Sequence, residues 1–198
     1  IYVQDFKPDW EIPINIEFFE NFGEDRASFN ELAGTKINGL MSWQLPQKML
    51  GIYFKNKYGI NSLDYQLFRD RSRNEFENFA LRASGSDWGQ AFLRDPLSAR
   101  IAEGNMKLAK SGYRPVILTI NGEYMGIHNM RSKINSSFIS QKIDLSYNEF
   151  DMVEHGDYAE VGDLIAYNHL LEVLSKDLSV QSNFDQVEDL VNIENYAD

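Results

Sequence analysis

The sequence contains no cysteine, so the chain can form no disulfide, no thiolate metal site and no cysteine nucleophile. It also contains no apolar run that approaches the ~20 residues of a membrane-spanning helix, and we therefore predict no membrane span. Basic residues are in the minority, because 19 Lys and Arg stand against 30 Asp and Glu, and the net charge is −11. We expect no nucleic-acid partner, since a protein that binds the phosphate backbone is ordinarily basic.

Several common catalytic motifs are absent as well. The sequence has no Walker loop, no His-Glu-x-x-His, no Gly-x-Ser-x-Gly and no Gly-x-Gly-x-x-Gly pattern. His128, His155 and His169 lack the spacing of metal ligands, and the acidic residues 149–160 lack the pattern of an EF-hand. We expect structural or surface roles for the histidines, solvated loops in 149–160, and no metal site on these residues.

The residues that are present predict a folded domain with a real core. Of 198 residues, 43% are apolar and 13% aromatic, which excludes a disordered chain. Asn121-Gly122 lies between two β-prone runs and predicts a hairpin with a type I′ turn. Alternating or β-branched patterns predict further strands in 11–19, 35–39, 48–54 and 76–82, and helical spacing begins at Trp88 and recurs in 95–102, 161–174 and 183–191. We predict an α+β fold with a twisted antiparallel sheet and packed helices, mostly β in 1–135 and mostly helical in 136–198.

Four charged residues lie close together around a glycine turn: Arg82, Asp87, Arg94 and Asp95. In one interpretation they form ion pairs that tie a strand to the next helix, with both aspartates as caps and Asp95 as the N-cap before Pro96. In the other, Arg82 or Arg94 faces a phosphate, because a guanidinium offers a planar fork of donors to an oxyanion. The residue pattern leaves both open.

Lys48 stands at the start of an apolar strand. A lysine held on a strand over a cleft can bind nucleotide phosphates, whereas a lysine on an edge strand simply extends to water. Trp43 and Trp88 occur in loop-like contexts, where exposed aromatic rings would suit a carbohydrate surface, although most aromatic residues are expected in the core.

A set of short motifs resembles the CotH kinase-like family of spore coat protein H. The motifs are Gly34-Thr-Lys-Ile-Asn-Gly39, Pro46-Gln-Lys48, Leu81-Arg-Ala-Ser-Gly-Ser-Asp-Trp88, Leu93-Arg-Asp95 and Asn121-Gly-Glu-Tyr-Met-Gly-Ile-His-Asn-Met-Arg131. Their order and spacing agree from about residue 12 to residue 198. The set is specific as a group, although no member is specific alone.

The resemblance implies an atypical protein-kinase-like fold, of which this chain resembles the N-terminal part. Some members of the family transfer phosphate from ATP, with a divalent metal, to Ser residues of spore coat proteins, and others are modules of extracellular or surface proteins. It therefore implies ATP and Mg²⁺ as cofactors, a protein substrate or a surface or coat protein as partner, and an extracellular, cell-surface or spore-coat location. The nucleotide-binding residues that it implies are Lys48, Arg82, Asp87, Arg94, Asp95 and Arg131.

The sequence departs from the family pattern at two positions and ends before a third feature. The Arg-Glu-Lys of the family reads Arg131-Ser132-Lys133, and the Ser-Arg before Pro-Gln-Lys reads Ser42-Trp43. The family's catalytic and metal-binding aspartates follow in a later segment, so we expect a domain that is incomplete at its C-terminus, and the catalytic residues stay unknown. Two hypotheses result: the nucleotide-binding portion of a CotH-like phosphotransferase, active or impaired, or a non-catalytic surface or spore-coat scaffold module on the same fold.

Overall fold

The computed structural model describes residues 10–39, 42–69, 74–102, 104, 106 and 108–197. The chain divides into two compact units. The first comprises Ile1–Ile101 with Ser111–Lys133, and the second comprises Ala102–Lys110 with Ile134–Asp198.

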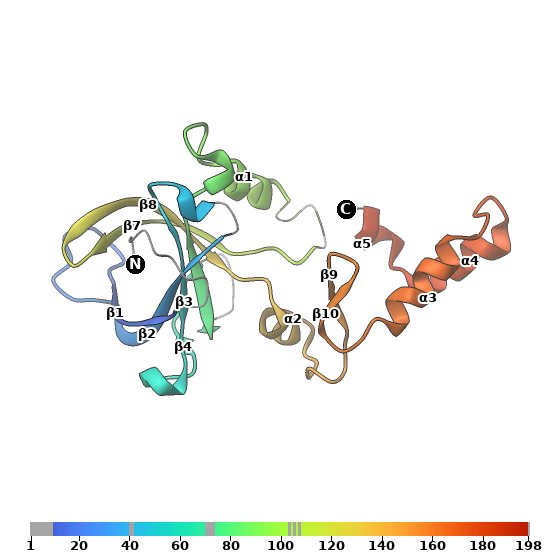
Figure 1. The fold of residues 1–198 in the computed structure, drawn as a ribbon, viewed down its shortest axis with the longest axis horizontal. Coiled ribbons are helices and arrows are strands. Elements are labelled where there is room, and N and C mark those ends of the chain that lie inside the picture. Colours follow the sequence, from blue (N-terminus) through green and yellow to red (C-terminus); the bar gives the residue numbers. More distant parts are fainter. Residues whose placement is uncertain are drawn as a thin grey trace. The chain divides into compact units, whose positions relative to one another are not determined.

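The first unit is built on a six-stranded antiparallel sheet (Figure 1). The strand order is β1-β2-β3-β6-β8-β7, and the bounds are β1 Ile12–Phe18, β2 Phe29–Asn38, β3 Met49–Tyr53, β6 Asn78–Arg82, β7 Tyr113–Ile120 and β8 Glu123–Ser132. The unit also contains a two-stranded sheet of β4 (Leu63–Asp64) and β5 (Glu75–Phe76), the helix α1 (Arg94–Ile101), and 3-10 helices at Ser42–Gln44, Asn56–Tyr58 and Gly85–Asp87.

The β7–β8 hairpin forms where the sequence predicts it. Asn121 and Gly122 join the two strands with φ angles of 52° and 83°. Both central residues of a type I′ turn need positive φ, which glycine and asparagine adopt at the least cost. The turn pairs Ile120 with Glu123, and a register shift between Ile117 and Thr119 then places Val116 opposite His128.

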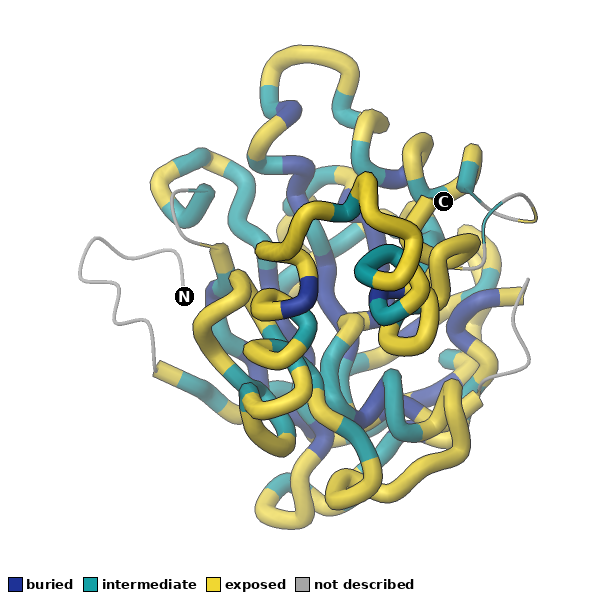
Figure 2. Tube along the Cα trace, turned by 90° about the vertical axis from the view of Figure 1, so that its right-hand side faces the viewer, coloured by how far each residue is buried: buried dark blue, intermediate teal, exposed yellow. Residues whose placement is uncertain are grey.

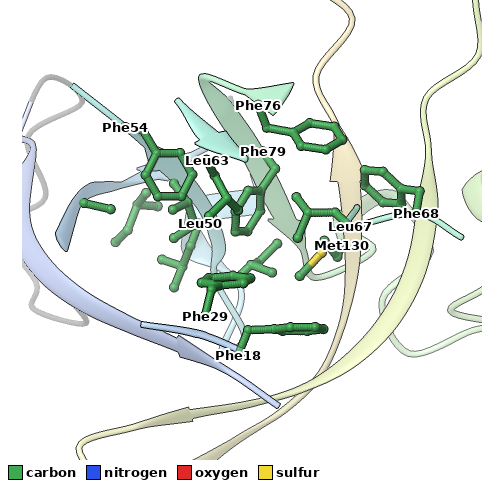
Figure 3. Close-up of a cluster of buried hydrophobic side chains, with 14 residues drawn as sticks. Phe18, Phe29, Leu50, Phe54, Leu63, Leu67, Phe68, Phe76, Phe79 and Met130 are labelled. Atoms are coloured by element: carbon green, nitrogen blue, oxygen red, sulfur yellow. The ribbon is translucent and has the colours of Figure 1, made fainter. Parts of the chain in front are cut away.

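The core lies against one face of the sheet. Leu50, Ile52, Phe79, Leu81 and Met130 are each at most 3% exposed, and they come from three neighbouring strands. Figure 3 shows these strands contributing to one aromatic-rich cluster, completed by Phe18, Phe29, Ala33, Ile37, Phe54, Leu63, Leu67, Phe68 and Phe76. The alternation of side chains along a strand turns the residues between them to the opposite face.

That opposite face carries polar and charged side chains on β6 and β8. Arg82 lies opposite Asn129, and Ala80 opposite Arg131. Directly opposed residues of an antiparallel pair share a face, so Arg82, Asn129 and Arg131 project together, away from Leu81 and Met130. The sheet therefore separates the core from a charged surface.

The second unit is smaller and has fewer buried residues. It contains α2 (Ser136–Ile143), a hairpin of β9 (Met152–Glu154) and β10 (Tyr158–Val161), and the helices α3 (Ile165–Leu174), α4 (Gln181–Leu190) and α5 (Ile193–Ala197). Among its described residues, the buried ones are Ser137, Phe138, Val173 and Val187; Figure 2 colours buried residues dark blue. Among the described residues, no helix combines the length and the apolar character that crossing a membrane requires.

The α+β fold and the antiparallel sheet are confirmed, whereas the kinase-like arrangement stays a prediction. Two local predictions are wrong. Residues 88–93 form turns rather than a helix, because Gly89 and Phe92 have φ angles of 74° and 63°. Asp95 is not the N-cap of α1: the Leu97 amide donates to Leu93 O, which makes Leu93 the cap and places Asp95 second in the helix.

Residues 149–161 also differ from expectation. Instead of solvated loops alone, this acidic stretch contains the β9–β10 hairpin, closed by turn residues that include His155 and Gly156 with φ angles of 56° and 81°. His128 lies on β8, where it is fully buried, and His169 lies on α3. Trp43 packs against the core cluster of the first unit, which removes it as an exposed carbohydrate platform.

Candidate functional site

Two arginines and one aspartate meet on the sheet face opposite the core. Arg82 ends β6, Arg131 lies on the neighbouring β8, and Asp95 is in the first turn of α1. Asp95 Oδ2 lies 2.7 Å from Arg131 Nη1 and 3.5 Å from Arg82 Nη1. The Arg131 side chain is only 7% exposed, whereas those of Arg82 and Asp95 are about 40% exposed. One carboxylate therefore serves two guanidinium groups, one buried and one accessible.

Arg131 is anchored at a second point. Its Nε donates to Ser111 Oγ at 3.2 Å, and Ser111 lies just before β7. A buried guanidinium needs a counter-ion and hydrogen-bond acceptors to offset its lost hydration. Asp95 and Ser111 supply these, so the Arg131 side chain is held in one position.

Asp87 organises the start of α1. Its carboxylate accepts hydrogen bonds from the Arg94 amide at 3.1 Å and the Ala91 amide at 3.3 Å, and its Oδ1 lies 3.2 Å from Arg94 Nε. Asp87 is 4% exposed, while the Arg94 side chain is 64% exposed. The aspartate thus accepts a hydrogen bond from the first free amide of the helix, and its negative charge interacts favourably with the positive end of the helix dipole. The Arg94 guanidinium lies at the surface.

The loop between β6 and α1 is fixed by residues that sequence reasoning missed. Ser84 adopts a φ of 50°, a conformation that costs free energy in a non-glycine residue. Its hydroxyl donates to Phe92 O at 2.9 Å and accepts from Asn129 Nδ2 at 2.7 Å. Asn129 is 1% exposed, and the sequence indicates it only through its place in the motif Asn121–Arg131. Asn129 on β8 therefore holds the loop that carries Asp87.

The cluster has a positive charge in excess. The guanidinium groups of Arg82, Arg94 and Arg131 stand against the carboxylates of Asp87 and Asp95. This local sign is opposite to the net charge of −11. An accessible guanidinium such as that of Arg82 offers paired N–H donors to a phosphate or carboxylate. The arrangement can therefore bind an oxyanion on the outer face of the sheet.

Lys48 lies in a segment that packs against this loop. A methyl group built on Gly85 would lie 2.4 Å from Ser42 Cβ, so the 3-10 helix Ser42–Gln44 lies directly against the loop between β6 and α1. Lys48 follows four residues later, is half-buried, and donates from Nζ to Leu45 O at 2.5 Å. The structure thus brings Arg82, Asp95 and Arg131 together, pairs Asp87 with Arg94 beside them, and places Lys48 on an adjoining segment.

A hollow of about 240 Å³ lies elsewhere in the first unit. It is lined by Phe68, Arg69, Arg100, Tyr113, Arg114 and Pro115, a set that includes none of the six predicted nucleotide-binding residues. The described part of the chain contains no group of three or more His, Cys, Asp or Glu side chains placed to hold a metal ion. Asp87 and Asp95 are both occupied by arginine contacts, so this cluster fits the phosphates of a nucleotide and not its Mg²⁺.

Comparison with known proteins agrees with the motif set. No curated protein matches the chain. The family model described as CotH kinase protein matches residues 35–198, a range that contains β3, the loop between β6 and α1, and the β7–β8 hairpin. The chain therefore belongs to the CotH kinase protein family.

Proposed function

We propose that this chain is the nucleotide-binding portion of a CotH-type phosphotransferase that transfers phosphate from ATP to Ser residues of a protein substrate. One observation carries the proposal: Arg82 and Arg131 share a single carboxylate on the sheet face opposite the core. The excess positive charge suits the phosphates of ATP, and the family makes a nucleotide the expected ligand. The partner is a protein substrate or a surface or coat protein, at an extracellular, cell-surface or spore-coat location.

Each residue has a defined part in this proposal. Arg82, which is partly exposed, contacts the phosphate oxygens. Arg131 attracts the phosphates electrostatically from a fixed, buried position. Lys48 adds a point charge from the adjoining segment. Asp87 and Asp95 position the arginines, and Arg94 lies at the exposed edge of the cluster. Mg²⁺ that arrives with ATP would offset part of the negative charge of the phosphates.

Equilibrium binding tests the proposal. We expect Mg²⁺-ATP to bind the chain, and Arg82→Ala to weaken this binding about tenfold or more, since a charge-assisted contact contributes about 1.5–3 kcal/mol. Arg26→Ala removes an exposed arginine in the loop before β2 and is the matched control. Adenosine, which has no phosphate, should bind equally to all three proteins. A wild-type chain that does not bind ATP, or an Arg82→Ala chain that binds it normally, would refute the proposal.

The non-catalytic alternative has one observation in its favour. Ser132 stands where the family pattern has Glu, and it is 4% exposed, with its hydroxyl accepting from the Gly112 amide at 2.6 Å. This position therefore offers no carboxylate to a nucleotide-binding lysine. A native protein that binds ATP but transfers no labelled phosphate to Ser-containing substrates would support a scaffold module, whereas metal-dependent turnover would exclude one.

A further inference from the structure

The Pro46-Gln-Lys48 segment is fastened to β8 by one buried histidine. His128 is fully buried, and both of its ring nitrogens reach this segment. Nε2 lies 3.1 Å from Lys48 O, and Nδ1 lies 3.1 Å from Gln47 Nε2. A carbonyl only accepts and a side-chain NH₂ only donates, so the two contacts together select the neutral imidazole that carries its proton on Nε2.

Gln47 completes the attachment. Its Nε2 also donates to Ile127 O at 2.6 Å, so the two hydrogens of the amide are used by neighbouring positions on β8. Gly126 leaves room for this amide: its φ is 95°, and a methyl group built there would lie 3.1 Å from Gln47 Nε2. The segment is therefore held at the Gln47 side chain and at the Lys48 carbonyl by Ile127 and His128, two consecutive residues of β8.

This attachment has a consequence for Lys48. The carbonyl that His128 binds belongs to Lys48 itself, so the hydrogen bond restrains the backbone rotation that decides where the lysine side chain leaves the chain. Gln47 restrains the residue immediately before it. A flexible four-carbon side chain contributes more to binding when its base is fixed, because fewer conformations are lost when a ligand binds.

We propose that Gln47 and His128 are positioning residues that orient Lys48 toward the phosphates of the bound nucleotide. This inference rests on the proposed function, because it needs a nucleotide for Lys48 to contact. If Gln47 and His128 act in this way, they raise the affinity only for ligands that carry phosphate, and they do so only through Lys48. A purely structural role would instead alter stability and the binding of all ligands together.

The test measures binding of ATP and adenosine to the full chain. We expect Gln47→Met, which keeps the size of the side chain but cannot donate, to weaken ATP binding about fivefold, the effect of about one net hydrogen bond. Adenosine binding should not change. Asn30→Ala removes an amide that bonds Glu17 at 2.9 Å in the same sheet, and this control should bind both ligands as the wild type does.

A double-mutant cycle separates positioning from general damage. In a Lys48→Ala chain, adding Gln47→Met should cause no further loss of ATP affinity. His128→Gln, whose amide can still donate to Lys48 O, should bind ATP more tightly than His128→Phe. Equal losses for ATP and adenosine, or additive effects of Gln47→Met and Lys48→Ala, would overturn the inference while leaving the proposed function intact. A wild-type chain that binds no ATP would overturn both, and a Gln47→Met chain with normal ATP affinity would overturn the inference alone.

Discussion

Replacing Asp95 by Asn should lower the stability of the protein and at the same time raise its affinity for polyphosphates. Asp95 is the counter-ion of Arg131, 2.7 Å away, and it also faces Arg82 at 3.5 Å. The substitution keeps an oxygen that accepts a hydrogen bond but removes the negative charge. Arg131, with a side chain only 7% exposed, then carries its charge in a poorly hydrated place.

The size of the stability loss follows from the burial of the pair. Breaking a fully buried ion pair costs about 3–5 kcal/mol, whereas an exposed pair contributes about 0–1 kcal/mol. Arg131 is close to the first case, but Asp95 is 40% exposed and Asn keeps part of the hydrogen bond. We expect a loss of about 1–2 kcal/mol, which corresponds to a fall in melting temperature of about 3–6 °C for a chain of this size.

The effect on binding has the opposite sign. Removing one carboxylate raises the excess charge of the arginine cluster, so a polyphosphate bound at Arg82 should gain about 1 kcal/mol of attraction at low ionic strength. We expect Asp95→Asn to bind ATP about fivefold more tightly in 20 mM salt, with the gain shrinking as salt is added.

Thermal unfolding and calorimetric titration of the same samples provide the check. Asp25→Asn makes the same change in net charge at an exposed loop position and is the control for both measurements. An unchanged melting temperature would show that Asp95 does not support Arg131. Weaker ATP binding by Asp95→Asn would show that the positions Asp95 gives to the arginines matter more than the charge it carries, and the reasoning about charge excess would then be wrong.

Two further predictions concern the first unit as a folded structure. A hydrogen bond from Arg114, with further ones from Tyr65 and Arg69, lowers the pKa of Glu20 from 4.5 to about 2, although burial acts in the opposite direction. The ionised Glu20 therefore stabilises the folded state by at most about 3 kcal/mol. This contribution is complete above pH 4.5 and is lost as the pH falls toward 2. Urea unfolding should show the stability difference between wild type and Glu20→Gln shrinking over that interval, and a constant difference would refute the assignment. Gly122→Ala should lower the free energy of unfolding by about 1 kcal/mol, because φ at this position is 83°; an unchanged urea midpoint would contradict the type I′ turn.

The parts of the fold that could be predicted are those governed by neighbours in sequence. Asn121-Gly122 specifies its own turn, and the alternation in 11–19 marks β1. The start of β2 was missed because 29–34 contains Asn30, Glu31 and Gly34, residues that local preference places in turns. The pairing of β2 with both β1 and β3 makes this segment a strand.

The candidate site was only partly predictable for a related reason. Arg82, Asp87, Arg94 and Asp95 are close in sequence, and their mutual ion pairs could be foreseen. The contact of Asp95 with Arg131 spans 36 residues and exists only because β6 pairs with β8 in a particular register. The alternation of residue types along a strand indicates on which face of the sheet each side chain lies. It does not indicate which strand lies beside it.

The serine at position 132 is better understood as part of the local anchoring than as a simple loss. Its hydroxyl accepts from the Gly112 amide at 2.6 Å, and its carbonyl accepts from Ser111 Oγ at 2.5 Å. Ser111 Oγ in turn accepts from Arg131 Nε. Ser132 therefore fixes the turn before β7 that carries the second acceptor of Arg131.

The close packing around Gly112 supports this interpretation. A methyl group on Gly112 would lie 2.6 Å from the ring of Phe68, so the backbone that Ser132 binds is pressed against the aromatic core. A glutamate at position 132 would have to displace this contact or bury its charge beside Phe68, which costs free energy unless a cation pairs with it. Asp95 pairs with Arg131 at 2.7 Å without any acidic group at 132. The serine at position 132 thus supplies no carboxylate but leaves the arginine cluster intact, so the two functional hypotheses differ in catalysis while both include the same cluster.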